Sequence, residues 1–236
     1  YNDLGVLVTG WSKGGKTETL LAFAANGAEY IGDEWVYISP DGQRISGIPE
    51  PVRVWDWHLD TMPQYWGRLK QSERTRLRTL KWMVNTLEQL DGAGKSLAPV
   101  KVMQRMAPLL KQQLHVNLPP HKLFGQKISK GVSSLDKLFF VGSHAAPEVT
   151  VQPVDPQVIA QRMVFSLQEE RSDFMSYYYK FRFAFPTASN PVIEQAEERQ
   201  RHLLTQLLAG KAAYELYHPY PVALPLLFDA VKPLLV

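Results

Sequence analysis

Residues 10–17 read Gly10-Trp11-Ser12-Lys13-Gly14-Gly15-Lys16-Thr17 and fit the pattern G-x-x-x-x-G-K-[ST] at every fixed position. The preceding run, Leu4-Gly5-Val6-Leu7-Val8-Thr9, is short and apolar and contains β-branched residues, which predicts a buried strand. The following residues predict a helix from Thr17 to Ala25, which Gly27 ends. A strand, a glycine-rich turn and a helix in this order are the context that a phosphate-binding P-loop requires.

The residue types of this motif suit a phosphate ligand. Gly10, Gly14 and Gly15 let the backbone curl, so that successive N–H groups point at phosphate oxygens beside a helix N-terminus. Lys16 then acts as a point charge on the β- and γ-phosphates, and the Thr17 hydroxyl as a Mg²⁺ ligand. The predicted nucleotide-binding residues are Gly10, Trp11, Ser12, Lys13, Gly14, Gly15, Lys16, Thr17 and Glu18. A glycine-rich turn that binds no ligand is the alternative.

Composition limits the classes of protein to consider. A chain of 236 residues with 45% hydrophobic residues can form one domain, or one domain with an insertion. A net charge of +3 suits anionic ligands without implying nucleic acid. The absence of cysteine excludes disulfides, thiolate metal sites and a cysteine nucleophile. No apolar run approaches the roughly 18 residues that span a bilayer, so we predict a cytoplasmic protein without a membrane partner. We also predict no nucleic-acid partner.

An acidic pair follows the P-loop helix. Residues 28–39 predict a strand that Asp33-Glu34 interrupts, and residues 40–43 predict a turn before a return strand over 44–48. Many P-loop enzymes place the acid on the Mg²⁺ side at the end of a later strand. Here the best later strand, residues 137–141, ends in Gly142-Ser143 without an acid. The acidic pair is therefore the candidate for that role.

These motifs together resemble the catalytic domain of HPr kinase/phosphatase and its phosphoenolpyruvate-carboxykinase-like relatives. The matching residues are Gly5 to Gly10, Ser12 to Glu18, Gly27, Asp33-Glu34, Gly47-Ile48-Pro49-Glu50 and, near the end, Ala212 to His218. The resemblance implies an α/β fold with a mixed, twisted P-loop sheet flanked by helices, and it makes Glu18 and Glu50 supporting residues. The second acid of the family's pair is Glu34 here, and residues 51–58 replace the family's glycine-rich signature. We therefore expect the acceptor to be a hydroxyl other than that of HPr.

Residues 52–134 predict a helical insertion within a single domain, 1–236. Residues 72–90 predict a helix, whose flank carries Arg68, Lys70, Arg74, Arg76, Arg78 and Lys81. This basic run is interpreted first as a solvated face and second as a surface for an acidic substrate or a cap over the nucleotide. Residues 91–96 look like a second P-loop, but Gln89 stands where the motif needs glycine, so we predict no phosphate site there. A further helix is predicted over 99–113 and an irregular lid over 119–130.

The last hundred residues are punctuated more clearly. They predict strands over 135–141 and 148–151, a helix that Asp155-Pro156 opens, and a helix from Asn190-Pro191 to about Leu208. The aromatic residues at 177–179, 181, 183 and 185 are interpreted as packing of a helix against the sheet, with a base-stacking platform as the alternative. The chain begins with Tyr1 rather than Met, as expected if residues before Tyr1 are missing.

The predicted function is ATP-dependent, Mg²⁺-requiring transfer of a phosphoryl group to a hydroxyl, with a serine of a protein, peptide or free amino acid as acceptor. Lys16 would hold the phosphates, Thr17 and Glu34 the metal, and Asp33 would accept the proton of the attacking hydroxyl. A homo-oligomer is compatible with this prediction. The alternative is a nucleotide-dependent switch or assembly module that hydrolyses ATP slowly and transfers nothing.

Overall fold

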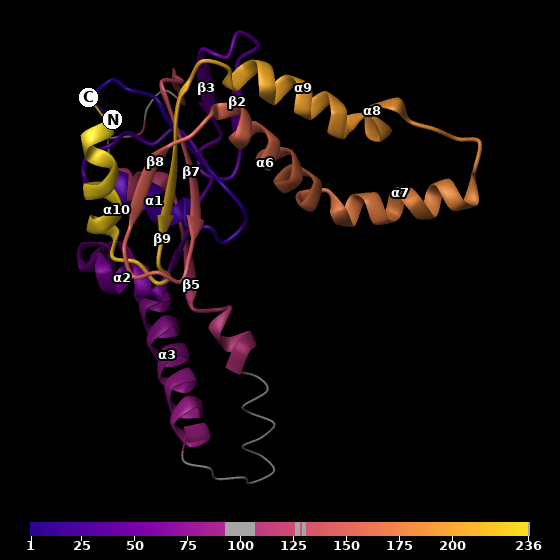
Figure 1. Ribbon diagram of the computed structural model, residues 1–236. Coiled ribbons are helices and arrows are strands. Elements are labelled where there is room, and N and C mark those ends of the chain that lie inside the picture. Colours follow the sequence, from indigo (N-terminus) through magenta and orange to yellow (C-terminus); the bar gives the residue numbers. More distant parts are fainter. Residues whose placement is uncertain (93–106, 126–127, 129–130, 236) are drawn as a thin grey trace. The chain divides into compact units, whose positions relative to one another are not determined.

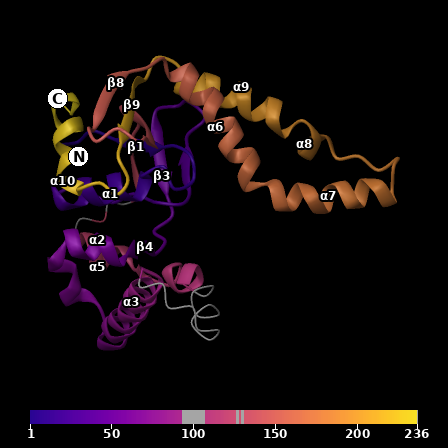
Figure 2. The ribbon, with the colours of Figure 1, turned by 60° about the horizontal axis from the view of Figure 1, so that its bottom comes forward.

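A computed structural model describes residues 1–92, 107–125, 128 and 131–235. The chain divides into two compact units, the first formed by Tyr1–Pro49 with Lys127–Val236 and the second by Glu50–Gln126. The second unit covers most of the predicted insertion, residues 52–134. Figures 1 and 2 show the ribbon in two views.

The first unit is built on a mixed four-stranded sheet flanked by helices. Its strands are β1 (Val6–Thr9), β7 (Lys137–Ser143), β9 (Ala212–His218) and β8 (Thr150–Pro153), in that order across the sheet. β1 runs parallel to β7 and β7 parallel to β9, whereas β8 is antiparallel to β9. Because β1 and β7 run side by side in the same direction, the P-loop leaves the sheet beside the end of β7.

Two pairs of helices pack on this sheet. α1 (Lys16–Ala25) packs against α10 (Leu224–Val231), where the rings of Phe23 and Phe228 meet edge to face with centroids 5.6 Å apart. The other pair consists of α6 (Pro156–Glu170) and α9 (Ala196–Leu208), and it shares a buried apolar cluster with Leu138 and Phe140 of β7. Since successive side chains of a strand point to opposite faces, the intervening Phe139 belongs to the other face of the sheet. A short 3₁₀ helix, η2 (Lys232–Leu234), follows α10.

A smaller sheet in the first unit corrects one predicted strand. It consists of β2 (Val36–Ile38), β3 (Arg44–Gly47) and β6 (Val132–Ser134), all antiparallel. Of the strand predicted over 28–39, only β2 and an isolated bridge at Tyr30 form, and Asp33 and Glu34 lie in a bend before β2. The chain crosses itself here: a Cβ on Gly32 would lie 2.8 Å from the Cα of Gly47. This close crossing leaves no room for a continuous extended strand.

The segment from α6 to α9 forms a long helical hairpin, with α7 (Ser172–Ala184) and α8 (Pro191–Glu194) at its far end (Figure 1). The predicted start of α6 is confirmed, because the Asp155 carboxylate accepts a hydrogen bond from the N–H of Gln157 at 2.9 Å and Pro156 occupies the first turn. The helix predicted over 191–208 is two helices that meet at Gln195. The prediction that the aromatic residues of 177–185 pack on the sheet is wrong, since Tyr177 is 71% and Phe183 92% exposed.

The second unit combines helices with a strand pair. β4 (Val52–Trp55) pairs antiparallel with β5 (His115–Leu118), and the helices are α2 (Asp56–Thr61), η1 (Pro63–Arg68), α3 (Gln71–Gly92) and α5 (Pro120–Phe124). The lid predicted over 119–130 is not irregular where it is described, because α5 forms there. Residues 107–111 are helical. The rest of the helix predicted over 99–113, and the loop residues Gly94, Lys95 and Ser96, lie outside the described residues.

Most of the basic run of this unit is used internally. Arg68 donates to the carbonyls of Lys122 and Leu123, Arg74 to those of Leu69 and Gly67, and Arg76 to that of His115. Arg78 lies over the Trp66 ring, and Lys81 pairs with Asp56 and Asp60. Arg68, Lys70, Arg76 and Arg78 are also exposed, as expected of a solvated face. The basic run therefore lies on the surface, and several of its side chains donate hydrogen bonds to backbone carbonyls of their own unit.

Candidate functional site

The glycines of the P-loop are required by close backbone contacts. A Cβ on Gly10 would lie 2.3 Å from the carbonyl oxygen of Val141 in β7, and one on Gly14 would lie 2.9 Å from the same atom. Lys13 and Gly15 adopt positive φ values of 63° and 102°. The loop can therefore curl over the end of β7 only because these positions lack side chains or tolerate left-handed backbone.

The loop leads into a helix N-terminus that no side chain caps. α1 begins at Lys16 with Gly15 as its N-cap residue, and no side chain accepts a hydrogen bond there. The first N–H groups of a helix have no carbonyl partner one turn earlier, and the helix dipole favours negative charge beside them. An anion is the ligand for which this geometry is suited.

Lys16 lies over the loop that it belongs to. Its ammonium donates hydrogen bonds to the carbonyl oxygens of Gly10 at 3.0 Å and Trp11 at 2.9 Å. Ser12 and Lys13 are exposed beside it, Thr17 is half-buried and Glu18 is buried in the first turn of α1. The predicted loop residues thus form one continuous turn, with the positive charge of Lys16 at its mouth.

A cavity of about 220 Å³ opens beside the loop, and we call it the P-loop cavity. Lys16 lines it together with Asp33 and Glu34, which come from the bend before β2. The far wall comes from α6, with Met163, Ser166, Leu167 and Glu170. The sequence predicts that Asp33 interrupts a strand, whereas in the structure it precedes one. The structure still brings Asp33 to the same cavity as Lys16.

Glu170 is a third carboxylate at this cavity, and its only signal in the sequence is an acidic pair at the end of a helix. Burial lowers the pKa of Lys16, because the charged ammonium loses solvent. Four carboxylates act in the opposite direction and favour the charged form, the strongest being Glu170, followed by Glu34 and Asp33. The lysine therefore lies in an acidic surrounding to which the last turn of α6 contributes most.

His218 is a second residue whose place the sequence did not predict. It ends β9 and is fully buried, and its Nε2 lies 3.2 Å from the carbonyl oxygen of Gly14, 204 residues away in the chain. Its Nδ1 lies 2.8 Å from the carbonyl oxygen of Pro219. A Cβ on Gly15 would lie 2.0 Å from Nε2. The imidazole ring thus packs directly against Gly14 and Gly15 of the P-loop, and we infer that it positions the loop.

The donor set of the P-loop cavity suits Mg²⁺ only with help from a ligand. Among the described residues, no three or more His, Cys, Asp or Glu side chains are grouped so that they could hold a metal ion by themselves. Mg²⁺ in nucleotide sites commonly keeps several waters and takes one or two protein oxygens besides phosphate oxygens. Glu34 lines the cavity and offers a hard oxygen donor of that kind. Thr17, in the first turn of α1, is half-buried and is not among the residues that line the cavity.

A small aromatic notch adjoins the cavity. Its volume is about 190 Å³, and Trp11 of the P-loop faces Phe140, Arg162 and Phe165 across it. The Arg162 guanidinium lies 4.9 Å from the centre of the Phe140 ring and 2.6 Å from the carboxylate of the buried Glu215. This ion pair fixes one wall of the notch, which continues into the P-loop cavity through Met163 and Ser166 of α6.

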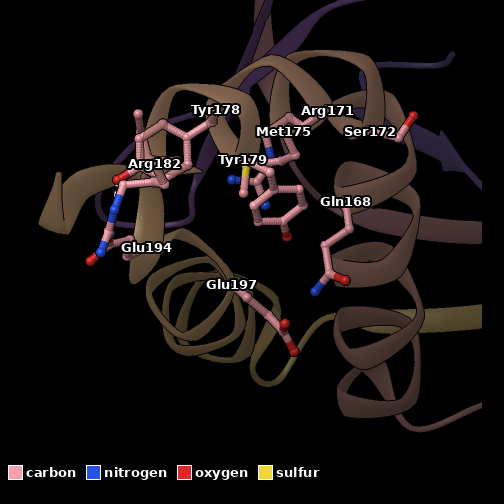
Figure 3. Close-up of a pocket in the computed structure, with 10 residues that line it drawn as sticks. Gln168, Arg171, Ser172, Met175, Tyr178, Tyr179, Arg182, Glu194 and Glu197 are labelled. Atoms are coloured by element: carbon pink, nitrogen blue, oxygen red, sulfur yellow. Dashed lines mark hydrogen bonds and ion pairs between the residues drawn. The ribbon is translucent and has the colours of Figure 1, made fainter. Parts of the chain in front are cut away.

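A larger cavity of the first unit lies elsewhere, inside the helical hairpin (Figure 3). It measures about 680 Å³ between α7 on one side and α8 and α9 on the other. Tyr178 donates a hydrogen bond to Glu194 at 2.7 Å, and Arg182 pairs with the same carboxylate. None of the predicted site residues lines this cavity, so it is separate from the P-loop cavity despite its larger volume.

Comparison of the chain with protein-family models, with curated proteins and with solved structures gave no match. None of the described helices is both long and apolar enough to cross a bilayer.

Proposed function

We propose that this protein is a kinase that uses ATP and Mg²⁺ to phosphorylate a hydroxyl, with a serine of a protein, peptide or free amino acid as the class of acceptor. One observation carries the proposal. Lys16, Asp33 and Glu34 line a single cavity at an uncapped helix N-terminus, although the acidic pair comes from a separate bend. Phosphoryl transfer needs these groups together, namely donors for phosphate, oxygen ligands for a metal and a base for the hydroxyl.

Each residue has a distinct part in the proposed reaction. The amides of the loop and the first turn of α1 hold the β- and γ-phosphates, and Lys16 adds a positive charge beside them. Mg²⁺, when bound through Thr17 and Glu34, neutralises charge on the phosphate oxygens. Asp33 accepts the proton as the acceptor oxygen attacks the γ-phosphorus and ADP leaves. Burial lowers the pKa of Lys16, and Glu170, which lines the same cavity, opposes this and favours the charged form that binds phosphate.

The proposal is tested by comparing transfer with nucleotide binding in matched variants. Asp33→Asn keeps the shape and removes the proton acceptor, so single-turnover transfer should fall by about 10²–10⁴ while the ATP dissociation constant changes little. Lys16→Ala removes a charge-assisted hydrogen bond, so the same titration should show ATP binding weakened about tenfold or more. Glu34→Gln should reduce transfer and its dependence on Mg²⁺ together.

A transfer assay with labelled ATP, together with these variants, separates the kinase from the alternative function, a nucleotide-dependent switch. A switch binds and slowly hydrolyses ATP without passing the phosphoryl group to a serine hydroxyl. Labelled ATP that yields labelled phosphate but no labelled acceptor, with a panel of serine proteins, peptides and free serine, would favour the switch. Transfer by Asp33→Asn at the unchanged rate would refute the assignment of the base. Unchanged ATP affinity in Lys16→Ala would refute the P-loop assignment itself.

A further inference from the structure

α7 exposes one side as a row of aromatic rings, which we call the aromatic stripe. It consists of Phe174, Tyr177, Phe181 and Phe185, exposed by 53%, 71%, 46% and 58%. The spacing of Phe174, Tyr177 and Phe181 places them on one face of the helix. Phe185, the residue that follows the end of α7, continues the row, with its ring centroid 5.3 Å from that of Phe181. Polar or charged residues normally cover a helix face that points to water, so a face of four rings indicates a partner.

The side of α7 next to the stripe is already occupied within its own unit. Tyr178 is buried, accepts a hydrogen bond from the backbone N–H of Asn190 at 3.0 Å and donates one to Glu194 of α8. Arg182 pairs with the same glutamate. Figure 3 shows Tyr178, Arg182 and Met175 on this inner side, around the hairpin cavity. The Phe181 ring stacks on Tyr178 with centroids 6.2 Å apart, so the stripe meets the hairpin at this ring. About half or more of each ring of the stripe nevertheless stays exposed after the hairpin has formed.

The area of the stripe fits the apolar core of a protein interface. A fully buried aromatic side chain removes about 150–250 Å² from water, so four rings at these exposures offer roughly 450 Å². A stable interface of ordinary size buries about 800 Å² on each partner, with an apolar core and a polar rim. The stripe supplies about half of that area, and the flanking side chains of α7 can supply the rim.

The charges beside the stripe indicate which partner it fits. Asp173 and Lys180 lie seven residues apart, two helical turns, on the same flank of the stripe. When two identical helices pack antiparallel, equivalent flanks meet, so Asp173 of one copy would lie near Lys180 of the other, and this contact occurs twice. A parallel pair would instead bring this flank against the side of α7 that Tyr178 and Arg182 already use for α8.

We propose that the aromatic stripe of α7 is the self-association surface of this protein, where a second copy of the chain packs antiparallel on α7. In this pairing Phe174 of one copy faces Phe181 of the other, and the two Tyr177 rings lie near the two-fold axis. Lys180 already lies 5.0 Å from the centre of the Tyr177 ring, so its ammonium sits at the rim, within reach of the second copy's acidic turn. The inference does not depend on nucleotide binding.

Sedimentation of the full chain over a range of concentrations tests this proposal. The chain should form a dimer. Tyr177→Glu should raise the dimer dissociation constant at least tenfold, because it puts a charge at the centre of an apolar interface. Phe183→Glu is the matched control: it lies on the same helix and is more exposed, at 92%, but it is outside the stripe. This variant should dissociate no more readily than the unaltered chain.

A charge exchange tests the antiparallel arrangement. Asp173→Lys and Lys180→Asp should each weaken the dimer about three- to tenfold, because each sets like charges opposite one another twice. The combined variant should restore the affinity, a result that a merely structural role of either residue would not produce. Circular dichroism and thermal unfolding would show that each variant is folded.

Several outcomes would overturn the proposal. One is a chain that stays monomeric at every concentration, as it would if residues 50–126 of the same molecule cover the stripe. Another is equal weakening by Tyr177→Glu and Phe183→Glu. A third is a combined charge variant that stays weak. Binding of the monomer to anionic phospholipid vesicles, lost in Tyr177→Glu, would assign the stripe to a membrane surface instead.

Discussion

The contact between Gly15 and His218 gives the sharpest test of how the fold supports the P-loop. Gly15→Ala would place a Cβ 2.0 Å from Nε2 and 2.7 Å from Cε1 of a ring that is fully buried. The ring cannot simply turn away, because its two nitrogens lie against the carbonyl oxygens of Gly14 and Pro219. We therefore expect the alanine to displace either the loop or the end of β9.

The expected loss of stability has two parts. A residue with a side chain at a φ of 102° is disfavoured by about 1–2 kcal/mol. Overpacking of a closed site typically costs about 1–3 kcal/mol. The sum, about 2–5 kcal/mol, corresponds to a melting temperature lower by roughly 4–20 °C for a chain of this size. His218→Ala in the same molecule should remove the cost of overpacking and leave the cost of the backbone conformation.

The assay is thermal and urea unfolding of Gly15→Ala, His218→Ala and the double variant, without nucleotide. If the ring is the obstacle, the double variant should be more stable than the sum of the two single losses by about 1–3 kcal/mol. Simple additivity of the two losses would refute the contact. Gly67→Ala is a suitable control, since nothing lies within 4 Å of the position that its methyl group would take, and it should change stability by much less.

Two further predictions concern stability in each unit. Burial raises the pKa of Asp136, but hydrogen bonds from Ser134 and from the N–H of Gly5, the latter at 2.7 Å, together with the charges of Lys211 and Lys137, lower it below its ordinary value of 3.8. Because the pKa of Asp136 is lower in the folded state, its contribution to stability is present above the pKa of the unfolded state and is lost as the pH falls through the pKa of the folded state. Asp136→Asn should therefore lose about 1 kcal/mol of stability at neutral pH and show a weaker fall of stability with acid in urea unfolding. An unchanged dependence on acid would contradict this. In the second unit, Arg74→Gln should lose about 1 kcal/mol of stability because the Arg74 side chain donates to the carbonyls of Leu69 and Gly67. Lys70→Gln, at an exposed neighbour, should change stability by less than about 0.5 kcal/mol. Equal effects of the two substitutions would refute a structural role for the Arg74 side chain.

The sequence predicted those parts of the fold that local rules decide. The glycine spacing of residues 10–17 required a loop between a strand and a helix, and β1 and α1 form on either side of it. Asp155 and Pro156 predict the start of α6, since a cap and a fixed φ act within one turn. The acidic pair is a candidate on its chemistry alone, and the structure brings Asp33 and Glu34 to the cavity of Lys16.

Local rules failed where a distant segment decided the outcome. The strand predicted over 28–39 is broken because Gly32 crosses Gly47. The aromatic residues of α7 have the pattern of a buried helix, but a pattern states only that a face is apolar and not which partner covers it. The basic run of the second unit is largely exposed, as its pattern predicts. That Arg68 and Arg76 also donate to carbonyls of Leu123 and His115 was not predictable, because only folding brings these segments close.

By itself, then, the sequence determined the P-loop, the helix that follows it and the types of residue available for phosphate chemistry, because these depend on backbone conformations and spacings within a few residues. Only the tertiary structure decided that Glu170 and His218 stand beside that loop, one in the last turn of α6 and the other at the end of β9. It also decided that the aromatic stripe of α7 faces outward. The physical reason is that contacts between distant segments are set by the packing of the whole core, which no local pattern encodes.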